Sequence, residues 1–498
     1  MNVNPITRFD YPDPDVIRVE DTYYMVSTTM HFMPGCEILQ SFDLVHWEHV
    51  TYVYETLDHT DAQQLKSGQN IYGQGMWAAS LRYHEGRFYI CFVANDTRKT
   101  YLYTSEKIDG PWKKQLIEGF YHDGSLLFDE DGRNYIVYGN DEIWITELNE
   151  DLTAPKKDGL HRLLVSDHKN PELGYEGSHI QKINGYYYIF LVHSLRDRWM
   201  RTEACFYSDS LEGEFTGGDV LCDDRGYCGQ GVAQGGIVDT PDGKWYAMLF
   251  QDSGAVGRIP ILLPVTWKDH FPVFGQNGHV PEEIEVHSTR PGYIYQPLVG
   301  SDDFCNGLLP RWQFNHDPDP RYYHLDALQG TYTITTREVC TELTQAVNTL
   351  TQRMSYPSCA AEVTVDASAL KEGDVAGLCA LQGCYAAVGI TKHHGKYEVL
   401  MLDKKEDGIL DMTEGTVVES HQMDFRLEAD FCNMKDEARC YYRVNKGDWL
   451  PIGTVHKLYF KLDHFTGCRF GLFCYAAEET GGSACFRDFK YYDVDEIS

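Results

Sequence analysis

Short stretches of alternating apolar and polar residues, separated by turn signals, run along the whole chain. Five times within the first 250 residues the pattern takes one form: a polar corner, two variable residues, a tyrosine and an apolar residue. Such a corner predicts a hairpin turn that leads into an aromatic strand. The five copies are Glu20–Met25, Glu85–Ile90, Asp131–Ile136, Asn184–Ile189 and Asp242–Ala247.

The spacing of these copies predicts a repeat architecture. Their tyrosines, Tyr24, Tyr89, Tyr135, Tyr188 and Tyr246, lie 65, 46, 53 and 58 residues apart. This distance fits one four-stranded sheet with its connections, and self-similarity at such a period is typical of repeat folds. We therefore expect residues 1–290 to form a five-bladed β-propeller.

A second domain is expected because 498 residues exceed one ordinary hydrophobic core. The blade rhythm is lost between Glu282 and Gly300, a stretch that contains two prolines. From Ser301 onward, short alternating strands follow one another closely and are separated by glycine-rich turns. This pattern predicts an antiparallel β-sandwich over residues 301–498, and thus an all-β chain.

The repeat also predicts a site, because equivalent positions of successive blades converge on one mouth of the central channel. Twelve residues before the repeat tyrosine stand Trp77, Asp123, Glu176 and Gln234, and in the shorter first copy Asp13 stands eleven residues before it. Three carboxylates, an aromatic ring and an amide in one register form a ring suited to a sugar. The alternative for each acid alone is a solvated loop residue.

Composition narrows the class of ligand and the compartment. The 43 basic and 75 acidic residues give a net charge of −32, which disfavours nucleic acid and anionic membranes. No apolar run reaches the roughly 20 residues that span a bilayer. The start has no secretory pattern, and the fifteen cysteines are scattered without paired motifs, so we expect a cytoplasmic protein with reduced, buried thiols.

A carboxylate ring of this kind suits hydrolysis of a glycosidic bond. One acid protonates the leaving oxygen, and in inverting enzymes a second carboxylate, roughly 6.5–9.5 Å away, activates a water on the opposite face of the sugar. A third carboxylate nearby is expected to raise the proton affinity of the acid by like-charge repulsion.

Several motifs closely resemble those of glycoside hydrolase family 43. The resemblance covers essentially the whole chain, because the start of the second region is similar to the C-terminal sandwich of the family's β-xylosidase branch. It implies a sandwich of the concanavalin or jelly-roll type. The motifs are Asn4–Ile6, Tyr11–Val19, Ser41–Trp47, Met76–Ser80, His122–Leu126, Glu176–Ile180, Gly257–Arg258, Pro264–Trp267 and Ser301–Phe304.

The resemblance implies a role for each of five positions. Asp13 corresponds to the general base, Asp123 to the residue that tunes and orients the acid, and Glu176 to the general acid. Arg258 resembles the family arginine that reaches the bound sugar, with a structural ion pair as the alternative. Trp77 would be a stacking wall for the sugar, with a core tryptophan as the alternative.

Three further positions concern the pocket wall. Many family members have a histidine in the fifth blade that faces a metal or water in the channel. This chain has Gln234 at that position. Calcium accepts an amide oxygen as a ligand, but softer ions favour imidazole. We expect no required cofactor and no protein-bound metal, and a channel calcium is left open. Phe32 stands where the family often has an aromatic pair before Pro-Gly, and Phe465 resembles a sandwich residue lent to the pocket rim, with sandwich core as the alternative.

These inferences predict an exo-acting, inverting glycosidase that releases terminal β-D-xylose from xylo-oligosaccharides. An α-L-arabinofuranosidase, alone or in addition, is the first alternative, and a noncatalytic sugar-binding propeller is an alternative of another class. A retaining fructan-active propeller fits less well because its signature motifs are absent from the sequence. The expected partner is a small oligosaccharide, and assembly into a homo-oligomer is left open.

Overall fold

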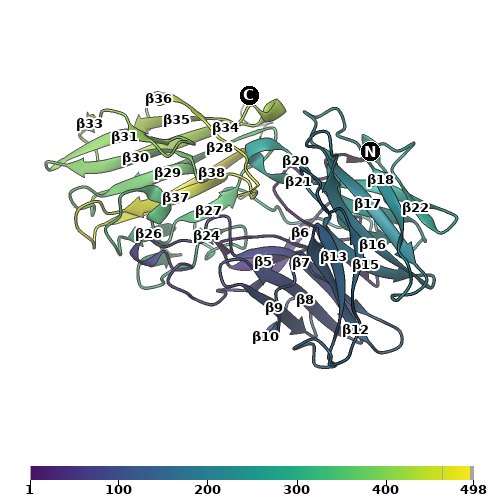
Figure 1. Cartoon of the computed structure of the whole chain (residues 1–498). Helices are drawn as coiled ribbons and strands as arrows, with labels where there is room; N and C mark the ends of the chain where they lie inside the picture. The colour runs from purple at the N-terminus through teal and green to yellow at the C-terminus, as the bar shows by residue number, and fades with distance from the viewer. Residues whose placement is uncertain (1, 463, 494–498) are drawn as a thin grey trace.

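A computed structural model describes residues 2–462 and 464–493 of the chain. Its described part is built almost entirely of β-strands arranged in two bodies, a propeller and a sandwich, which pack side by side (Figure 1). The predicted propeller followed by a sandwich is therefore confirmed. Residues 1 and 494–498, the outer ends of the two predicted domains, lie outside the described residues. Within the described part, no helix has the length and apolar character needed to cross a bilayer.

The propeller has five antiparallel sheets of four strands each. From the inner to the outer strand, the blades are β2 Asp15–Val19, β3 Thr22–Ser27, β5 Gly35–Ser41 and β6 Glu48–Tyr54; β7 Met76–His84, β8 Arg87–Ala94, β9 Lys99–Ser105 and β10 Lys113–Ile117; β11 Ser125–Phe128, β12 Asn134–Asn140, β13 Glu142–Leu148 and β14 His161–Ser166; β15 Glu176–Ile183, β16 Tyr186–Ser194, β17 Arg201–Ser208 and β18 Thr216–Leu221; β19 Val232–Asp239, β20 Trp245–Asp252, β21 Arg258–Lys268 and β22 Phe271–Phe274.

Each polar corner of the repeat forms the hairpin between the two innermost strands of a blade, as the sequence predicts. In the fourth blade, Asn184 and Gly185 both adopt positive φ, 50° and 85°, which is the geometry of a tight two-residue hairpin. Three of the five repeat tyrosines are buried, and Tyr24 and Tyr89 are half-buried but pack against the cores of their blades. The repeated phrase thus encodes both the turn and a core position of each blade.

The five innermost strands pack against one another in a ring, and the ring closes between the first and fifth blades. There the Asn4 side chain makes two hydrogen bonds to the backbone of Leu262: it donates to the carbonyl at 2.7 Å and accepts from the amide at 3.0 Å. Strand β1 (Asn2–Val3) pairs with β23 (Glu283–Ile284) beyond the fifth blade, and Arg18 pairs with Asp239 at 2.5 Å. The N-terminal segment therefore ties the two ends of the propeller together.

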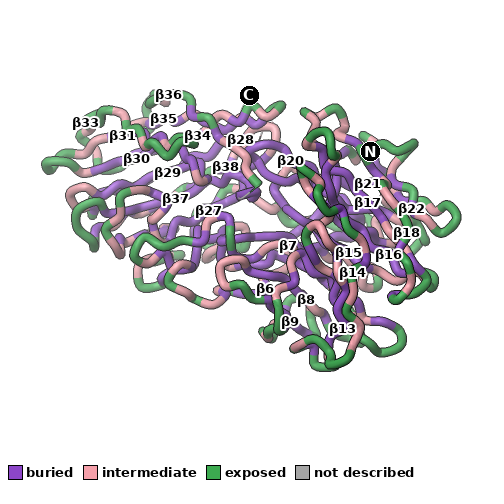
Figure 2. The backbone as a smooth tube through the Cα atoms, viewed as in Figure 1, coloured by how far each residue is buried: buried purple, intermediate pink, exposed green. Residues whose placement is uncertain are grey.

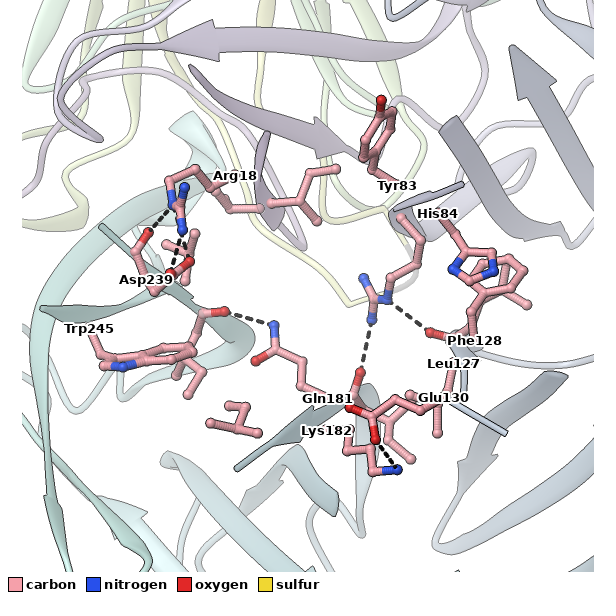
Figure 3. Close-up of a pocket in the computed structure, with 18 residues that line it drawn as sticks. Arg18, Tyr83, His84, Leu127, Phe128, Glu130, Gln181, Lys182, Asp239 and Trp245 are labelled. Carbon is pink, nitrogen blue, oxygen red and sulfur yellow. Dashed lines mark hydrogen bonds and ion pairs between the residues drawn. The ribbon is translucent and has the colours of Figure 1, made fainter. Parts of the chain in front are cut away.

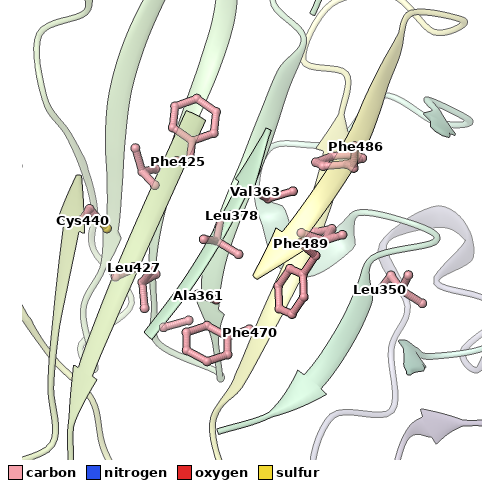
Figure 4. Close-up of a cluster of buried hydrophobic side chains, with 14 of the residues drawn as sticks. Leu350, Ala361, Val363, Leu378, Phe425, Leu427, Cys440, Phe470, Phe486 and Phe489 are labelled. Atoms are coloured by element: carbon pink, nitrogen blue, oxygen red, sulfur yellow. The ribbon is translucent and has the colours of Figure 1, made fainter. Parts of the chain in front are cut away.

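The second domain stacks a nine-stranded sheet on a seven-stranded sheet. Aromatic and aliphatic side chains from both sheets fill the space between them, including Phe425, Phe470 and Phe486 (Figure 4). Burial of each such side chain contributes about 1.5–3 kcal/mol. The strands are β24 Gln313–Asn315, β25 Tyr323–Asp326, β26 Thr331–Thr335, β27 Leu350–Arg353, β28 Ser358–Asp366, β29 Val375–Leu381, β30 Tyr385–His393, β31 Lys396–Lys404, β32 Leu410–Met412, β33 Thr416–Val418, β34 Gln422–Asp430, β35 Glu437–Val444, β36 Leu450–Lys457, β37 Arg469–Tyr475 and β38 Ser483–Asp493, with short 3-10 turns at Lys66–Gly68, Gly254–Val256, Leu343–Gln345 and Cys432–Met434.

The two domains share a buried contact, which appears as a continuous purple band of tube between them in Figure 2. The short strand β4 (Phe32–Met33), from the loop between β3 and β5 of the first blade, pairs with β24 and so joins the sandwich sheet. Across the same contact, Arg353 of the sandwich pairs with Glu37 of the propeller at 2.7 Å, and both side chains are buried. The sandwich sheet, through β4, and the ion pair of Arg353 with Glu37 therefore both cross the boundary between the two domains.

Candidate active site

The residues of the predicted ring lie at or just before the first residues of the five innermost strands. Asp13, Asp123 and Gln234 share a left-handed backbone, with φ of 52°, 47° and 64°, a conformation that aspartate and its relatives tolerate and that concentrates at functional sites. Glu176 is followed by Gly177 at φ 66°, where an added Cβ would lie 2.7 Å from the Gln234 side chain. The glycine is required because the fourth and fifth blades approach closely there.

These residues surround one cavity of about 240 Å³. It is bounded by residues of all five blades and, on its remaining side, by a loop of the sandwich that follows β36. The lining residues are Asp13, Trp77, His122, Asp123, Asn140, Leu173, Glu176, Trp199, Arg201, Gln234, Arg258, Leu462 and Phe465.

Asp13 is held by two donors on opposite sides. The Arg258 guanidinium donates to one carboxylate oxygen at 2.6 Å and the Thr28 hydroxyl donates to the other at 2.6 Å. Arg258 also donates to Asp252, which accepts from Arg201 at 3.0 Å, so one buried carboxylate separates two arginines. The Asp13 carboxylate is thus oriented and its charge is balanced inside a closed pocket.

The other two acids of the ring meet around His122. Its Nε2 lies 3.5 Å from Asp123 Oδ2 and 3.6 Å from Glu176 Oε2. Asp123 also accepts from the Gly177 amide at 3.0 Å, and Glu176 accepts from the Asn140 side chain at 2.7 Å. The two carboxylates and the imidazole therefore lie close enough for the charge of each to influence the protonation of the others.

The sequence predicts a raised pKa for Glu176, the expected general acid, and the structure differs from this prediction. Burial raises the pKa of Asp123 to about 6, aided by the charges of Glu176 and Asp13 and opposed by His122. Burial also raises the pKa of Glu176, but His122 and two arginines outweigh it and hold that pKa below its usual value. Burial lowers the pKa of His122, yet the two carboxylates raise it to about 9. The raised carboxyl pKa therefore falls on Asp123, because Arg201 and Arg258 stabilise the charge of Glu176 in addition to His122, which lies at nearly the same distance from both acids.

Two aromatic rings form the walls. Trp77 and Phe465 meet edge to face with ring centroids 5.3 Å apart, and the Arg258 guanidinium lies 3.7 Å from the centre of the Phe465 ring. Phe465 comes from the sandwich and is 3% exposed, so it is both interface core and pocket wall. Asp463 of the same loop lies outside the described residues.

The structure brings together all but one of the residues predicted for the site. The exception is Phe32, which is not among the described residues that line the cavity. It lies in β4, paired with β24, and its ring is covered by the guanidinium of Arg469 at 3.5 Å. Phe32 is therefore buried in the contact between the domains, because the loop that carries it forms a strand of the sandwich sheet.

Several lining residues were not predicted, and two of them had a readable signal. Arg201 begins the third strand of the fourth blade, just as Arg258 begins the third strand of the fifth. Arg201 stands thirteen residues after the repeat tyrosine of its blade, and Arg258 stands twelve residues after that of the next blade. Counting forward from the tyrosine, as well as backward, would therefore have identified Arg201. His122 directly precedes Asp123. Asn140 is the last residue of β12 and lies at the same mouth of the channel, but no motif in the sequence marks it.

The opposite mouth of the channel holds a larger cavity, of about 450 Å³, at the far ends of the innermost strands (Figure 3). Two pairs of its charged lining groups are engaged with each other: Arg18 with Asp239 at 2.5 Å and Lys182 with Glu130 at 3.1 Å. The three ring carboxylates lie at the other mouth. We therefore place the active site in the smaller cavity.

A group with metal-ligand chemistry lies where the acids meet. Among the described residues, His122, Asp123 and Glu176 offer ligand atoms that all lie within 4.8 Å of one another. A cation held there would occupy both carboxylates and the imidazole. Gln234, the other expected metal ligand, lines the cavity with its side-chain oxygen buried and without a hydrogen-bond partner in the described structure.

A ring of carboxylates in an aromatic-walled pocket at one mouth of a five-bladed propeller defines the class of protein as a glycosidase. Residues 3–272 match the model of glycosyl hydrolases family 43, and residues 301–492 match that of the beta xylosidase C-terminal concanavalin A-like domain. The chain belongs to glycosyl hydrolase family 43, and its second domain is of the concanavalin type. The resemblance drawn from the sequence motifs is confirmed.

Relatives and solved structures agree with this assignment. A β-xylosidase of Formosa agariphila is 27% identical over 99% of this chain and 89% of its own length. A non-reducing end α-L-arabinofuranosidase of Bacteroides ovatus is 26% identical over 66% of this chain and 63% of its own length. The structure of a protein of Bacteroides eggerthii, described as a bifunctional GH43-CE, is 42% identical with a TM-score of 0.91. It covers 99% of this chain, which spans 63% of that longer protein.

Proposed function

We propose that this chain is an exo-acting, inverting glycosidase that removes terminal β-D-xylose from short xylo-oligosaccharides. An α-L-arabinofuranosidase activity, in addition or instead, is the second candidate, because one of the relatives similar to this chain bears that name. The single observation that carries the proposal is the pocket itself, in which Asp13, Asp123 and Glu176 from three blades line one small cavity.

Asp13 acts as the general base. A water on the far side of the sugar gives a proton to the Asp13 carboxylate while its oxygen attacks the anomeric carbon, and the bond to the leaving oxygen breaks. Thr28 and Arg258 fix the carboxylate for this transfer. Because the nucleophile is water and not a side chain, the configuration at the anomeric carbon is inverted.

Glu176 acts as the general acid and gives its proton to the leaving oxygen. Burial is the largest influence that raises its pKa, and a sugar that expels water from the pocket strengthens this influence. Asp123 adds like charge from the side of His122 and accepts from the Gly177 amide next to the acid. Asp123 therefore tunes the protonation of Glu176 and also positions it.

Exo action follows from the closed end of the pocket. A cavity of about 240 Å³ lies below the roughly 300–1,000 Å³ of pockets for larger ligands, so it accepts one sugar unit and not an internal stretch of a polymer. Phe465 and Leu462 of the sandwich close its side. The Nη1 of Arg201 and the Oε1 of Gln234 are buried without hydrogen-bond partners in the described structure and are available to sugar hydroxyls.

We further propose that the enzyme acts in the cytoplasm. The support is that all fifteen cysteines are free thiols, nine of them buried, as expected in a reducing compartment. Short imported oligosaccharides would then be the substrates. Activity that disappears after treatment with a reductant would contradict this proposal, and the test is the same assay with and without dithiothreitol.

The decisive experiment compares nitrophenyl β-D-xylopyranoside with nitrophenyl α-L-arabinofuranoside, followed by xylobiose and xylotriose as natural substrates. The Asp13→Asn variant serves as the control for contaminating activity. We expect release from the xyloside and single xylose units from the oligosaccharides. Faster hydrolysis of the arabinofuranoside would favour the second candidate, and hydrolysis of neither, with sugar binding retained, would favour a noncatalytic propeller.

A further inference from the structure

Three histidines from both domains meet beside the pocket and have no place in the proposed reaction. His31 precedes β4, His316 follows β24, and His464 lies in the sandwich loop that also carries Phe465. Their exposures are 1%, 0% and 9%. Histidine is rarely buried in groups, because any proton gained by one ring is repelled by its neighbours.

The rings are in direct contact. The His31 ring lies 4.9 Å from that of His316 and 5.3 Å from that of His464, measured between centroids. Tyr72 completes the group with its ring 4.5 Å from His316, 4.9 Å from His31 and 6.1 Å from His464. We call His31, Tyr72, His316 and His464 the interdomain histidine cluster.

Hydrogen bonds fix the cluster in its neutral form. The backbone amide of Ile71 donates to Nε2 of His316 at 2.9 Å, so that nitrogen carries no proton. The amide of His316 donates to the carbonyl of His31 at 3.1 Å, which joins the two domains at this point. A charged His316 would have to break the contact with Ile71.

The charges that face the cluster also oppose protonation. Burial holds the pKa of His31 well below its usual value, with His316, His464 and Arg469 acting in the same direction. Burial, with the charge of His464 acting in the same direction, lowers the pKa of His316 to about 3. The nearby Asp317 is engaged with His59 at 2.5 Å on the outer side of the contact.

The cluster is coupled to the pocket through the loop that follows His464. Beyond Phe465, the loop is tied to the propeller by Gly467, whose amide donates to Asp10 at 2.8 Å. The other oxygen of Asp10 accepts from the amide of Arg258 at 2.8 Å. Phe465 thus lies between two anchors, the carboxylate of Asp10 on one side and the packing of His464 against His31 and Tyr72 on the other.

We propose that the interdomain histidine cluster is a positioning device that seats Phe465 against Trp77 and Arg258 and thereby sets the affinity of the sugar pocket. His31 and Tyr72 each contact the other three rings, and of the three histidines only His31 contacts both of the others in the described contacts. The inference rests on the proposed function, in which Phe465 is a wall of the pocket. The three histidines are not among the described residues that line the cavity, so they act through Phe465.

The first test replaces His31 by alanine, which removes the ring between His316 and His464. Loss of this contact releases the His464 end of the loop. We therefore expect KM for the preferred nitrophenyl glycoside to rise about tenfold, which corresponds to the loss of one aromatic contact, with kcat nearly unchanged. His31→Phe should restore most of the affinity, because Nδ1 of His31 has no hydrogen-bond partner in the described structure and the ring supplies the packing.

A double-mutant cycle separates positioning from general stability. In a Phe465→Ala background, His31→Ala should have no further effect on kcat/KM, because the wall that it positions is already gone. His456→Ala is the matched control: this sandwich histidine is 2% exposed, bonds Asp403 at 2.7 Å, and is neither a member of the cluster nor among the residues that line the cavity. It should lower the melting temperature while KM stays at the wild-type value.

The outcomes distinguish this inference from the proposed function. Independent, additive effects of His31→Ala and Phe465→Ala, or an equal rise of KM in His456→Ala, would overturn the positioning role. If His31→Ala does not fold, His464→Ala enters the same cycle. If the wild type hydrolyses neither glycoside, the proposed function fails alone, and a crystal structure of His31→Ala still decides: an unmoved Phe465 overturns the inference and a displaced one supports it.

Discussion

Replacement of Glu176 by glutamine tests the general acid most directly, because it removes one exchangeable proton and almost no volume. The structure predicts that the variant folds normally. Glu176 lies at the pocket edge with 18% of its side chain exposed, and glutamine keeps an oxygen to accept from Asn140, which donates to Glu176 at 2.7 Å. Any loss of activity then reports on the proton.

The magnitude depends on the leaving group and on what replaces the lost proton. General acid catalysis typically contributes 10²–10⁴-fold, and we expect a loss in this range on xylobiose, whose sugar leaving group needs full protonation. The neighbouring donor is His122, with Nε2 3.6 Å from the acid and a pKa that the two carboxylates raise to about 9 against the effect of burial. His122 is fixed toward Asp123 as well, so we expect it to recover only part of the loss.

The assay is a comparison of kcat/KM for xylobiose and for an aryl xyloside with an acidic phenol, in the wild type and in Glu176→Gln. The phenol leaves with little protonation, so the variant should lose roughly tenfold or less on it. The ratio between the two losses is the measurement. Glu176→Asp, which keeps a proton but retracts it, is a control that should fall between the two forms.

Equal losses on both substrates, with folding verified by circular dichroism, would refute the reasoning and remove Glu176 from the acid role. A loss on xylobiose below about tenfold would show that His122 substitutes fully for the acid. The variant His122→Asn combined with Glu176→Gln then identifies the donor, because removal of both groups should bring the loss back to the full range.

Four further predictions concern other groups. Proton NMR of early turnover should show an inverted product because Asp13 activates water; a retained product would sink this mechanism. Asp123→Asn should move the alkaline limb of the pH profile of kcat/KM to lower pH, since loss of a neighbouring negative charge makes the acid easier to deprotonate; an unmoved limb in a folded variant argues against the tuning role. Burial raises the pKa of Glu37, but Arg353 and His49 lower it to about 2. The stability from this ion pair is therefore complete above pH 4.5 and is lost as pH falls through about 2, so Glu37→Gln should cost about 3–5 kcal/mol in urea unfolding at neutral pH, and the cost should shrink in acid. Deletion from Ser301 onward should abolish activity or solubility because it exposes the interdomain contact; a folded, fully active propeller would contradict this.

The sequence by itself determined the propeller and most of its active site. The polar corner and the buried tyrosine recur because each blade must turn at one end of its inner strand and fill its own core, and such local requirements repeat at a fixed period. Trp77, Asp123, Glu176 and Gln234 stand twelve residues before that tyrosine and Asp13 stands eleven before it, so their convergence on one mouth could be predicted by counting.

Only the tertiary structure decided what joins across the chain. Phe32 is drawn into a sandwich strand, and Phe465 enters the pocket from a loop of the other domain. Asp13 meets Arg258 across 245 residues, a pairing that no local pattern encodes. The raised carboxyl pKa falls on Asp123 because both acids are buried beside His122 but only Glu176 is also stabilised by Arg201 and Arg258, and these contacts depend on the packing of blades that are far apart in sequence.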